Sequence, residues 1–211
     1  MSGSTPPKGP PFAPSLDFER ALRLATLAHQ GQARRGSGTP YIEHPLAVAL
    51  ILDRAGFGED VAIAGLLHDV AEDTDVTPDR IACDFGPTVA ALVAHASEIK
   101  LGPTGAKRPW LDRKRDHVDA VRSAPDEAKG LVLADKLHNL LSIRLDLLEG
   151  RPIWDAFHAP RADVLRYYAE MIDACRSDDP RVAALADEAR EHLATLAGVG
   201  DGNREIGALE G

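Results

Sequence analysis

Cysteine is scarce in this chain of 211 residues, which contains only Cys83 and Cys175. Two cysteines cannot form the disulfide framework of a small secreted domain, and free thiols are typical of the reducing cytosol. The sequence also lacks a run of about 20 apolar residues, the length that a membrane-spanning helix requires. Its first residues lack the apolar centre of a signal peptide. These absences predict a soluble, cytoplasmic protein with no membrane partner.

Aromatic residues are also scarce, and the chain has no net positive charge. Aromatics make up only 5% of the chain, whereas hydrophobic residues, mainly alanine and leucine, make up 44%. This composition favours helices packed on helices over β-sheets. The formal net charge of −9 argues against nucleic acid as a partner. It does not exclude a small anionic ligand, because a local basic patch can oppose the overall charge.

Apolar residues recur with helical spacing through most of the chain. We expect one all-α domain, a compact multi-helix bundle, over residues 15–197, without strands or internal repeats. Residues 1–14 are rich in proline, glycine and serine and are expected to form a disordered leader, and residues 198–211 a flexible tail. Helices are expected near these segments: 15–31, 44–56, 59–74, 77–85, 88–99, 111–124, 125–150, 160–176 and 180–197.

Several helix boundaries have recognisable signals. Ser15 is placed to cap the first helix, and Thr77 precedes a proline in the arrangement typical of a helix start. Gly56 is expected to end the second helix. Gly86, followed by a proline, should interrupt the helical pattern of residues 77–99.

Polar residues at apolar-rich helix positions indicate a metal site. His44, the adjacent pair His68 and Asp69, and Asp135 all lie in such positions, where an isolated charge would be costly. A single buried histidine is usually a hydrogen-bonded core residue. Two imidazoles with two carboxylates, however, suit a divalent transition ion such as manganese, iron or zinc. The combination therefore predicts metal ligands.

Two further acids, Glu72 and Asp73, follow the histidine–aspartate pair. On a continuous helix His68 and Glu72 would share a face, as would Asp69 and Asp73. The adjacent His68 and Asp69 would diverge by about 100° and would need partners from other helices. Alone, the two acids would be interpreted as a solvated helix end. Beside a metal ion they can orient a water molecule and accept its proton.

Three segments of the chain resemble a known family: "GTPYIEHPLAVALIL", "AGLLHDVAEDTDVTPDRIACDFGPTVAALV" and "LVLADKLHNLLSI". The spacing of the histidines and aspartates is similar to that of the HD phosphohydrolase superfamily. Within it, the chain resembles the hydrolase domain of the Rel/SpoT alarmone enzymes, over residues 16–195. The element "HDVAEDT" is the most specific part. Because no synthetase domain is attached, the chain is most similar to the stand-alone small alarmone hydrolases.

This resemblance implies a metal-dependent enzyme that removes the 3′-pyrophosphate of (p)ppGpp, giving GDP or GTP and pyrophosphate. The family's usual ion is Mn²⁺, although other divalent ions suit such a site. Glu72 and Asp73 match the catalytic acidic pair. The metal ligands of the family match His44, His68, Asp69 and Asp135.

The substrate is strongly anionic, so the resemblance also implies local cations. Arg35 matches a position that stacks near the nucleobase, a role that suits the planar guanidinium. The basic segment near residue 110 faces phosphate in the stand-alone hydrolases. Arg113 and Lys114 are the preferred pair there. About half of the basic run is expected to be ordinary solvated surface, because one helix face cannot direct all five side chains inward: Lys107, Arg108, Arg113, Lys114 and Arg115.

Helix spacing adds candidates from the segment 125–150. Asn139 follows Asp135 by four residues and should face the same pocket, and Ser142 lies one turn further on. Lys136 is expected to point elsewhere and to form an ion pair. Four other histidines are expected to be structural or exposed: His29, His95, His117 and His138.

The sequence departs from the family at one position that matters for the substrate. A lysine usually follows the pocket arginine, but here Gly36 follows Arg35, which leaves guanine preference open and makes (p)ppApp an alternative. Another HD activity, such as a nucleotidase or an NADPH phosphatase, is a second alternative. A nucleotide-sensing module without catalysis is a third. The oligomeric state is not predicted.

Overall fold

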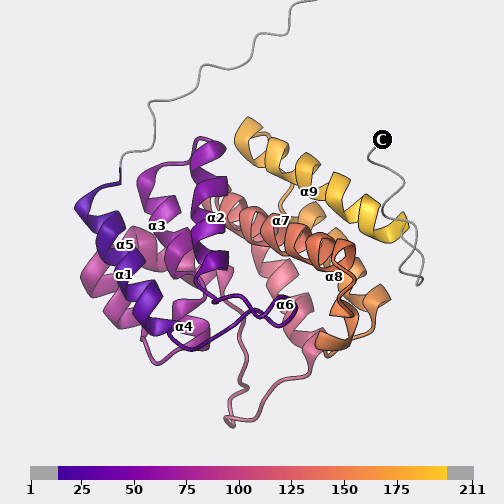
Figure 1. Ribbon diagram of the computed structural model, residues 1–211. Coiled ribbons are helices and arrows are strands. Elements are labelled where there is room, and N and C mark those ends of the chain that lie inside the picture. The colour runs from indigo at the N-terminus through magenta and orange to yellow at the C-terminus, as the bar shows by residue number, and fades with distance from the viewer. Residues whose placement is uncertain (1–13, 199–211) are drawn as a thin grey trace, which may run out of the picture.

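The computed structural model describes residues 14–198, and all regular structure in this range is helical (Figure 1). The expected all-α class is confirmed. Apart from helices, the described residues form two isolated β-bridges, Ala33 with Pro40 and Leu101 with Lys107. The expected leader and tail lie outside the described residues, except Pro14 and Gly198. The elements are α1 (Leu16–Ala28), α2 (Glu43–Arg54), α3 (Glu59–Leu67), α4 (Val70–Asp73), α5 (Pro78–Ala96), α6 (Trp110–Arg122), α7 (Asp126–Leu148), the 3₁₀ turn η1 (Ile153–Ala156), α8 (Arg161–Ala174) and α9 (Pro180–Gly198).

Helix α7 runs through the middle of the bundle (Figure 1) and packs against α2, α3, α5, α8 and α9. Residues 131–138 of this helix are all buried. A helix with apolar residues on every side is normally a core helix. The central position of α7 explains how Asp135 and Lys136 come to be buried among leucines.

The predicted boundary signals act as expected. Ser15 Oγ accepts hydrogen bonds from the backbone N–H groups of Asp17 and Phe18, both at 3.1 Å. Thr77 caps α5 through the N–H of Arg80 at 3.2 Å. Gly86 has φ of 87° and kinks α5 in its middle, a backbone conformation that glycine adopts at little cost.

One prediction about helix continuity is wrong. The segment 59–74 is not a single helix, because α3 ends at Leu67 and α4 starts at Val70. Between them His68 and Asp69 form a tight turn, with φ and ψ of −92° and −11° at Asp69. Both residues keep near-helical backbone angles, and the partners expected from other helices are His44 of α2 and Asp135 of α7.

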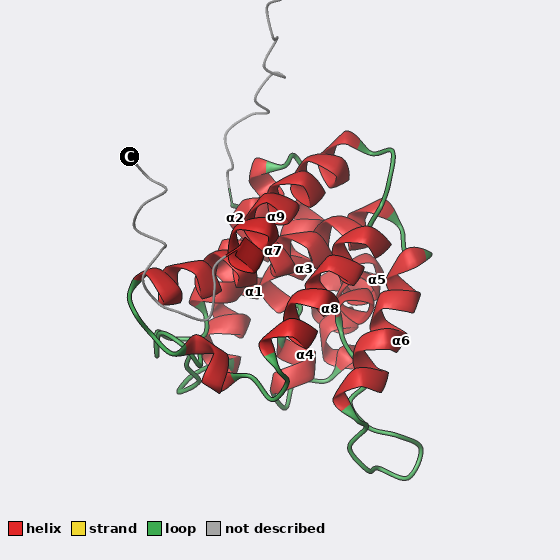
Figure 2. Cartoon of the chain, turned by 90° about the vertical axis from the view of Figure 1, so that its right-hand side faces the viewer, coloured by secondary structure: helices red, strands yellow, loops and turns green. Residues whose placement is uncertain are grey.

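The segment of residues 97–109 connects α5 to α6. Figure 2 shows it extending away from the helices beside α6. Its base is held by the backbone hydrogen bond from Arg108 N to the carbonyl of Lys100 at 3.0 Å. None of the described helices is long and apolar enough to cross a membrane.

Candidate active site

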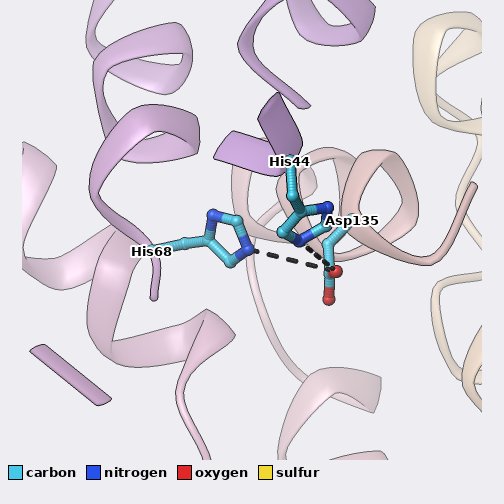
Figure 3. Close-up of side chains that lie close together, drawn as sticks. All are labelled: His44, His68 and Asp135. Carbon is cyan, nitrogen blue, oxygen red and sulfur yellow. Dashed lines mark ion pairs between the residues drawn. The ribbon is translucent and has the colours of Figure 1, made fainter. Parts of the chain in front are cut away.

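Three buried side chains converge from three helices. His44 lies in the first turn of α2, His68 at the C-terminal end of α3 and Asp135 in the middle of α7, and Figure 3 shows them pointing toward one point. One ligand atom from each lies within 4.8 Å of the others. Nε2 of His44 is 3.2 Å from Oδ1 of Asp135, and Nε2 of His68 is 3.9 Å from the same atom. The sequence separates these residues by up to 91 positions, and the fold brings them together.

The nitrogen atoms of His68 show that this cluster suits a cation. Its Nδ1 lies 2.8 Å from the carbonyl of Gly65, which accepts a hydrogen bond and so places the ring proton on Nδ1. Nε2 is buried, has no hydrogen-bond partner among the described residues and faces the carboxylate of Asp69 at 3.2 Å. A lone pair that faces carboxylate oxygens requires a proton or a metal ion between them. Burial lowers the pKa of His68, but the neighbouring carboxylates outweigh this and raise it to about 9.

His44 is oriented by a second histidine. Its Nδ1 lies 2.7 Å from Nδ1 of His138, so Nε2 is directed at the carboxylates. Burial lowers the pKa of His44 below its ordinary value and lowers that of His138 to about 4. Both shifts favour neutral rings, in which one Nδ1–H donates to the other Nδ1. Metal-binding histidines are commonly fixed in this way through the nitrogen that does not bind the metal. His138, expected to be structural or exposed, therefore has a definite partner at the site.

Asp69 adjoins the cluster. Its Oδ2 lies 3.2 Å from His68 Nε2 and 3.5 Å from His44 Nε2. The same oxygen accepts a hydrogen bond from the hydroxyl of Tyr41 at 2.7 Å. Burial would raise the pKa of Asp69, but the adjacent His68 outweighs this and holds it well below its usual range. Asp69 is thus an ionised carboxylate placed to act as a fourth ligand.

The charge of Asp135 is balanced by its neighbour Lys136. Nζ of Lys136 lies 2.5 Å from Oδ2 of Asp135, and both side chains are buried. Burial would lower the pKa of Lys136, but Asp135 holds it well above its ordinary value. The expected ion pair is confirmed. The expectation that Lys136 points elsewhere is wrong, because its side chain lines the same cavity as the predicted substrate residues.

Two acids, Glu72 and Asp73, lie on the short helix α4, which follows Asp69. Lys100 Nζ lies between them, 2.9 Å from Oε1 of Glu72 and 2.6 Å from Oδ1 of Asp73. Oε2 of Glu72 accepts a hydrogen bond from the backbone N–H of Glu98 at 3.0 Å. Burial raises the pKa of Glu72 above its ordinary value, the direction that favours proton uptake by a general base near neutral pH.

A cavity of about 300 Å³ lies along α7 and is lined by Asp73, whereas Glu72 does not border it. Four predicted substrate residues line it: Arg35, Lys114, Asn139 and Ser142. Asn139 accepts a hydrogen bond from Arg34 at 2.7 Å and donates one to Oδ1 of Asp135 at 2.6 Å. The metal-ligand residues themselves do not line the cavity, and Asn139 links its wall to Asp135.

Arg113 is placed differently from its predicted neighbour. It is absent from the cavity lining and pairs with Glu98, at 2.9 Å from Oε2. Lys114 pairs with Oε1 of the same carboxylate and also lies 4.4 Å from the ring centre of Tyr167. Glu98 thus fixes the position of both cations, but only Lys114 borders the cavity.

The cavity includes residues that sequence reasoning did not select. Asp146 continues the series Asp135, Asn139 and Ser142 along α7 at intervals of four, three and four residues, which place all of them on one helix face. That spacing was a usable signal. No local pattern marks the others, which reach the cavity only through tertiary packing: Arg34, Tyr41, Ile153, Phe157, Tyr167 and Tyr168.

The fold and the cluster define a class of protein: a helical domain with two histidines and an aspartate converging on one metal site. Comparison with family models gives the same class, since residues 21–153 match the HD domain family. The chain belongs to the HD domain family.

Its relatives include named enzymes. Guanosine-3′,5′-bis(diphosphate) 3′-pyrophosphohydrolase MESH1 of Mus musculus is 40% identical over 123 residues, which are 57% of this chain and 65% of the mouse protein. The human protein of that name is 38% identical over 133 residues, which are 62% of this chain and 71% of the human protein. The chain thus spans about two thirds of the length of these relatives.

A solved structure extends the similarity to the fold. The structure described as "A metazoan ortholog of SpoT hydrolyzes ppGpp and plays a role in starvation responses" superposes with a TM-score of 0.71 and 28% sequence identity. The match covers 89% of this chain and 98% of that chain.

Proposed function

We propose that this protein hydrolyses the 3′-pyrophosphate of (p)ppGpp-type nucleotides, releasing pyrophosphate and GDP or GTP. The observation that supports this function best is the convergence of His44, His68 and Asp135 on one point next to a cavity lined by cations. Asp73 of the acid pair lines that cavity as well. The named activity of the similar MESH1 proteins agrees with it.

His44, His68, Asp69 and Asp135 would hold the ion, which we propose to be Mn²⁺. A set of two imidazoles and two carboxylates fits a divalent transition ion, and the unpartnered Nε2 of His68 fits it as well. When bound, such an ion lowers the pKa of a coordinated water and stabilises charge on phosphoryl oxygens.

Glu72 and Asp73 would orient the attacking water and take its proton. The water oxygen forms a bond to the phosphorus attached to the 3′ oxygen. The bond between that phosphorus and O3′ breaks, and O3′ takes up a proton to become the ribose hydroxyl. Burial raises the pKa of Glu72, which suits a carboxylate that accepts a proton in this step.

The cations of the cavity would bind the phosphate groups. Burial and the adjacent Lys136 lower the pKa of Lys114 below its ordinary value, because two ammonium groups border one cavity. A phosphate placed between them would relieve this repulsion. Arg35, Asn139 and Ser142 would contact the nucleoside further along α7, and Arg113 would act through Glu98 rather than through direct contact.

The test is pyrophosphate release from ppGpp by the Mn²⁺-loaded protein. Glu72→Gln and Asp73→Asn should each lower kcat by about 100-fold or more, the usual contribution of general acid–base catalysis. Asp75→Asn is the matched control, since Asp75 is exposed two residues beyond the pair and should leave kcat unchanged. Absence of pyrophosphate release by the wild-type protein would refute the proposed reaction.

A further inference from the structure

One acid in the cavity has no role in the reaction proposed above. Asp146 of α7 is only 3% exposed and borders the cavity at the end away from the metal ligands. Its Oδ1 accepts a hydrogen bond from Arg151 Nη1 at 2.7 Å. Within residues 14–198 no hydrogen bond to its Oδ2 is found. A buried carboxylate has about four acceptor sites, so Asp146 retains acceptor capacity for a ligand.

The backbone of Gly36 determines where this carboxylate lies. A Cβ added to Gly36 would be 2.1 Å from Oδ2 of Asp146 and 2.4 Å from Cδ1 of Ile153. No side chain fits there without displacing the acid. The position of Asp146 therefore depends on a glycine at position 36, because the carboxylate occupies the space that a side chain there would fill.

The distance along α7 leaves room for a nucleotide together with its contacts at both ends. Asp135 and Asp146 are separated by 11 residues on one helix face, which corresponds to about 16 Å at a rise of 1.5 Å per residue. A nucleotide with its 3′-phosphate near Asp135 would thus extend its base toward Asp146. Apolar side chains of Ile143, Ile153 and Phe157 line the same end and suit the faces of a planar base.

We infer that Asp146 contacts the Watson–Crick edge of the nucleobase and selects guanine over adenine, an inference that rests on the proposed function. Guanine presents two neighbouring donors on that edge, N1–H and the N2 amino group, and an ionised carboxylate only accepts hydrogen bonds. Adenine presents its N6 amino group beside the lone pair of N1. That lone pair would face the carboxylate in a buried site, where two unpaired acceptors are costly. Although Gly36 replaces the lysine that is usual in the family, Asp146 beside it would provide a preference for guanine.

Calorimetric binding of GDP and ADP to the full-length, Mn²⁺-loaded protein tests this selectivity without any need for turnover. The wild-type protein should bind GDP more tightly, by about 5- to 150-fold, the range for a bidentate contact to a base. In Asp146→Asn the amide offers one donor and one acceptor, the pattern that matches adenine. The GDP preference should fall at least fivefold, with ADP binding retained or improved. Equal affinity of the wild type for GDP and ADP, or binding of neither, would overturn the inference.

Two further variants separate base contact from a structural role. Arg151→Gln removes the ion pair with Asp146 but leaves the cavity lining intact, so it should retain the GDP preference. Loss of the preference in this variant to the extent seen in Asp146→Asn would show that Asp146 only stabilises the adjoining turn. Gly36→Ala displaces the carboxylate without changing any charge and should lower the preference, which provides a test should Asp146→Asn fail to fold.

Failure of this inference can be distinguished from failure of the hydrolase proposal. GDP preference that depends on Asp146, without pyrophosphate release from ppGpp, would refute the reaction and leave the role of Asp146 supported. Pyrophosphate release with equal affinity for GDP and ADP would support the reaction and refute the role of Asp146. Where turnover is observed, kcat/KM for ppGpp relative to ppApp should change in Asp146→Asn in the same direction as the binding ratio.

Discussion

Lys136→Met tests the electrostatics of the metal cluster directly. Lys136 is 8% exposed and its Nζ lies 2.5 Å from Oδ2 of Asp135. Methionine has a similar length and adapts its shape to buried space, so the substitution removes the positive charge with little change in packing. What remains is a buried carboxylate without its nearest cation.

The expected magnitude depends on whether a metal is bound. Removal of one partner from a buried ion pair typically costs about 3–5 kcal/mol, because the other charge stays buried. Without metal, Lys136→Met should therefore lose about this much free energy of unfolding. With Mn²⁺ bound beside Asp135, the ion supplies positive charge in place of the ammonium group. The loss should then fall to about 2 kcal/mol, the order of one hydrogen bond to a charged group.

Urea unfolding in chelator and in saturating Mn²⁺ measures both values. Lys129→Met is the matched control, since Lys129 lies on the same helix and its Nζ donates to the carbonyl of Arg176 at 3.2 Å. It should lose less than about 1.5 kcal/mol, equally in both conditions. An identical loss for Lys136→Met with and without Mn²⁺ would refute the claim that the ion and the lysine balance the same carboxylate.

Two other predictions concern the free energy of unfolding of variants at Glu98 and Gly130. Burial raises the pKa of Glu98, but Lys114 outweighs this and lowers it below its ordinary value, so its stabilisation is present above about pH 4.3 and is lost as the pH falls through the folded pKa. Glu98→Gln should lose more stability at pH 7 than at pH 3 in urea unfolding, and an equal loss at both would contradict this. In Gly130→Ala the new Cβ would lie 2.2 Å from Phe57 Cζ, and such overpacking costs about 1–3 kcal/mol, offset by about 1 kcal/mol of helix propensity. Gly130→Ala combined with Phe57→Leu should lose less than the sum of the single losses, whereas strict additivity would show that the two residues do not clash.

Much of the site could be predicted because its members have local signatures. His44, the His68–Asp69 pair and Asp135 stand out as polar residues in apolar helical segments. Asn139 and Ser142 follow from the 3.6-residue period of the helix that carries Asp135, since residues four and seven positions further on share its face. The same period reaches Asp146, but its meaning depends on what lies opposite, and the period does not show that.

The sequence by itself determined the helical class, the ends of several helices and the residues suited to bind a metal. These properties depend on side chains within a few positions of one another, through caps, glycine conformations and apolar spacing. The tertiary structure decided which neighbours the polar groups meet. It ended α3 at Leu67 and placed the ring of His68 beside Asp69 and Asp135. It also directed Arg113 to Glu98 and pressed Gly36 against Asp146. These contacts join residues far apart in the chain, and the local periodicity around one partner does not predict the other.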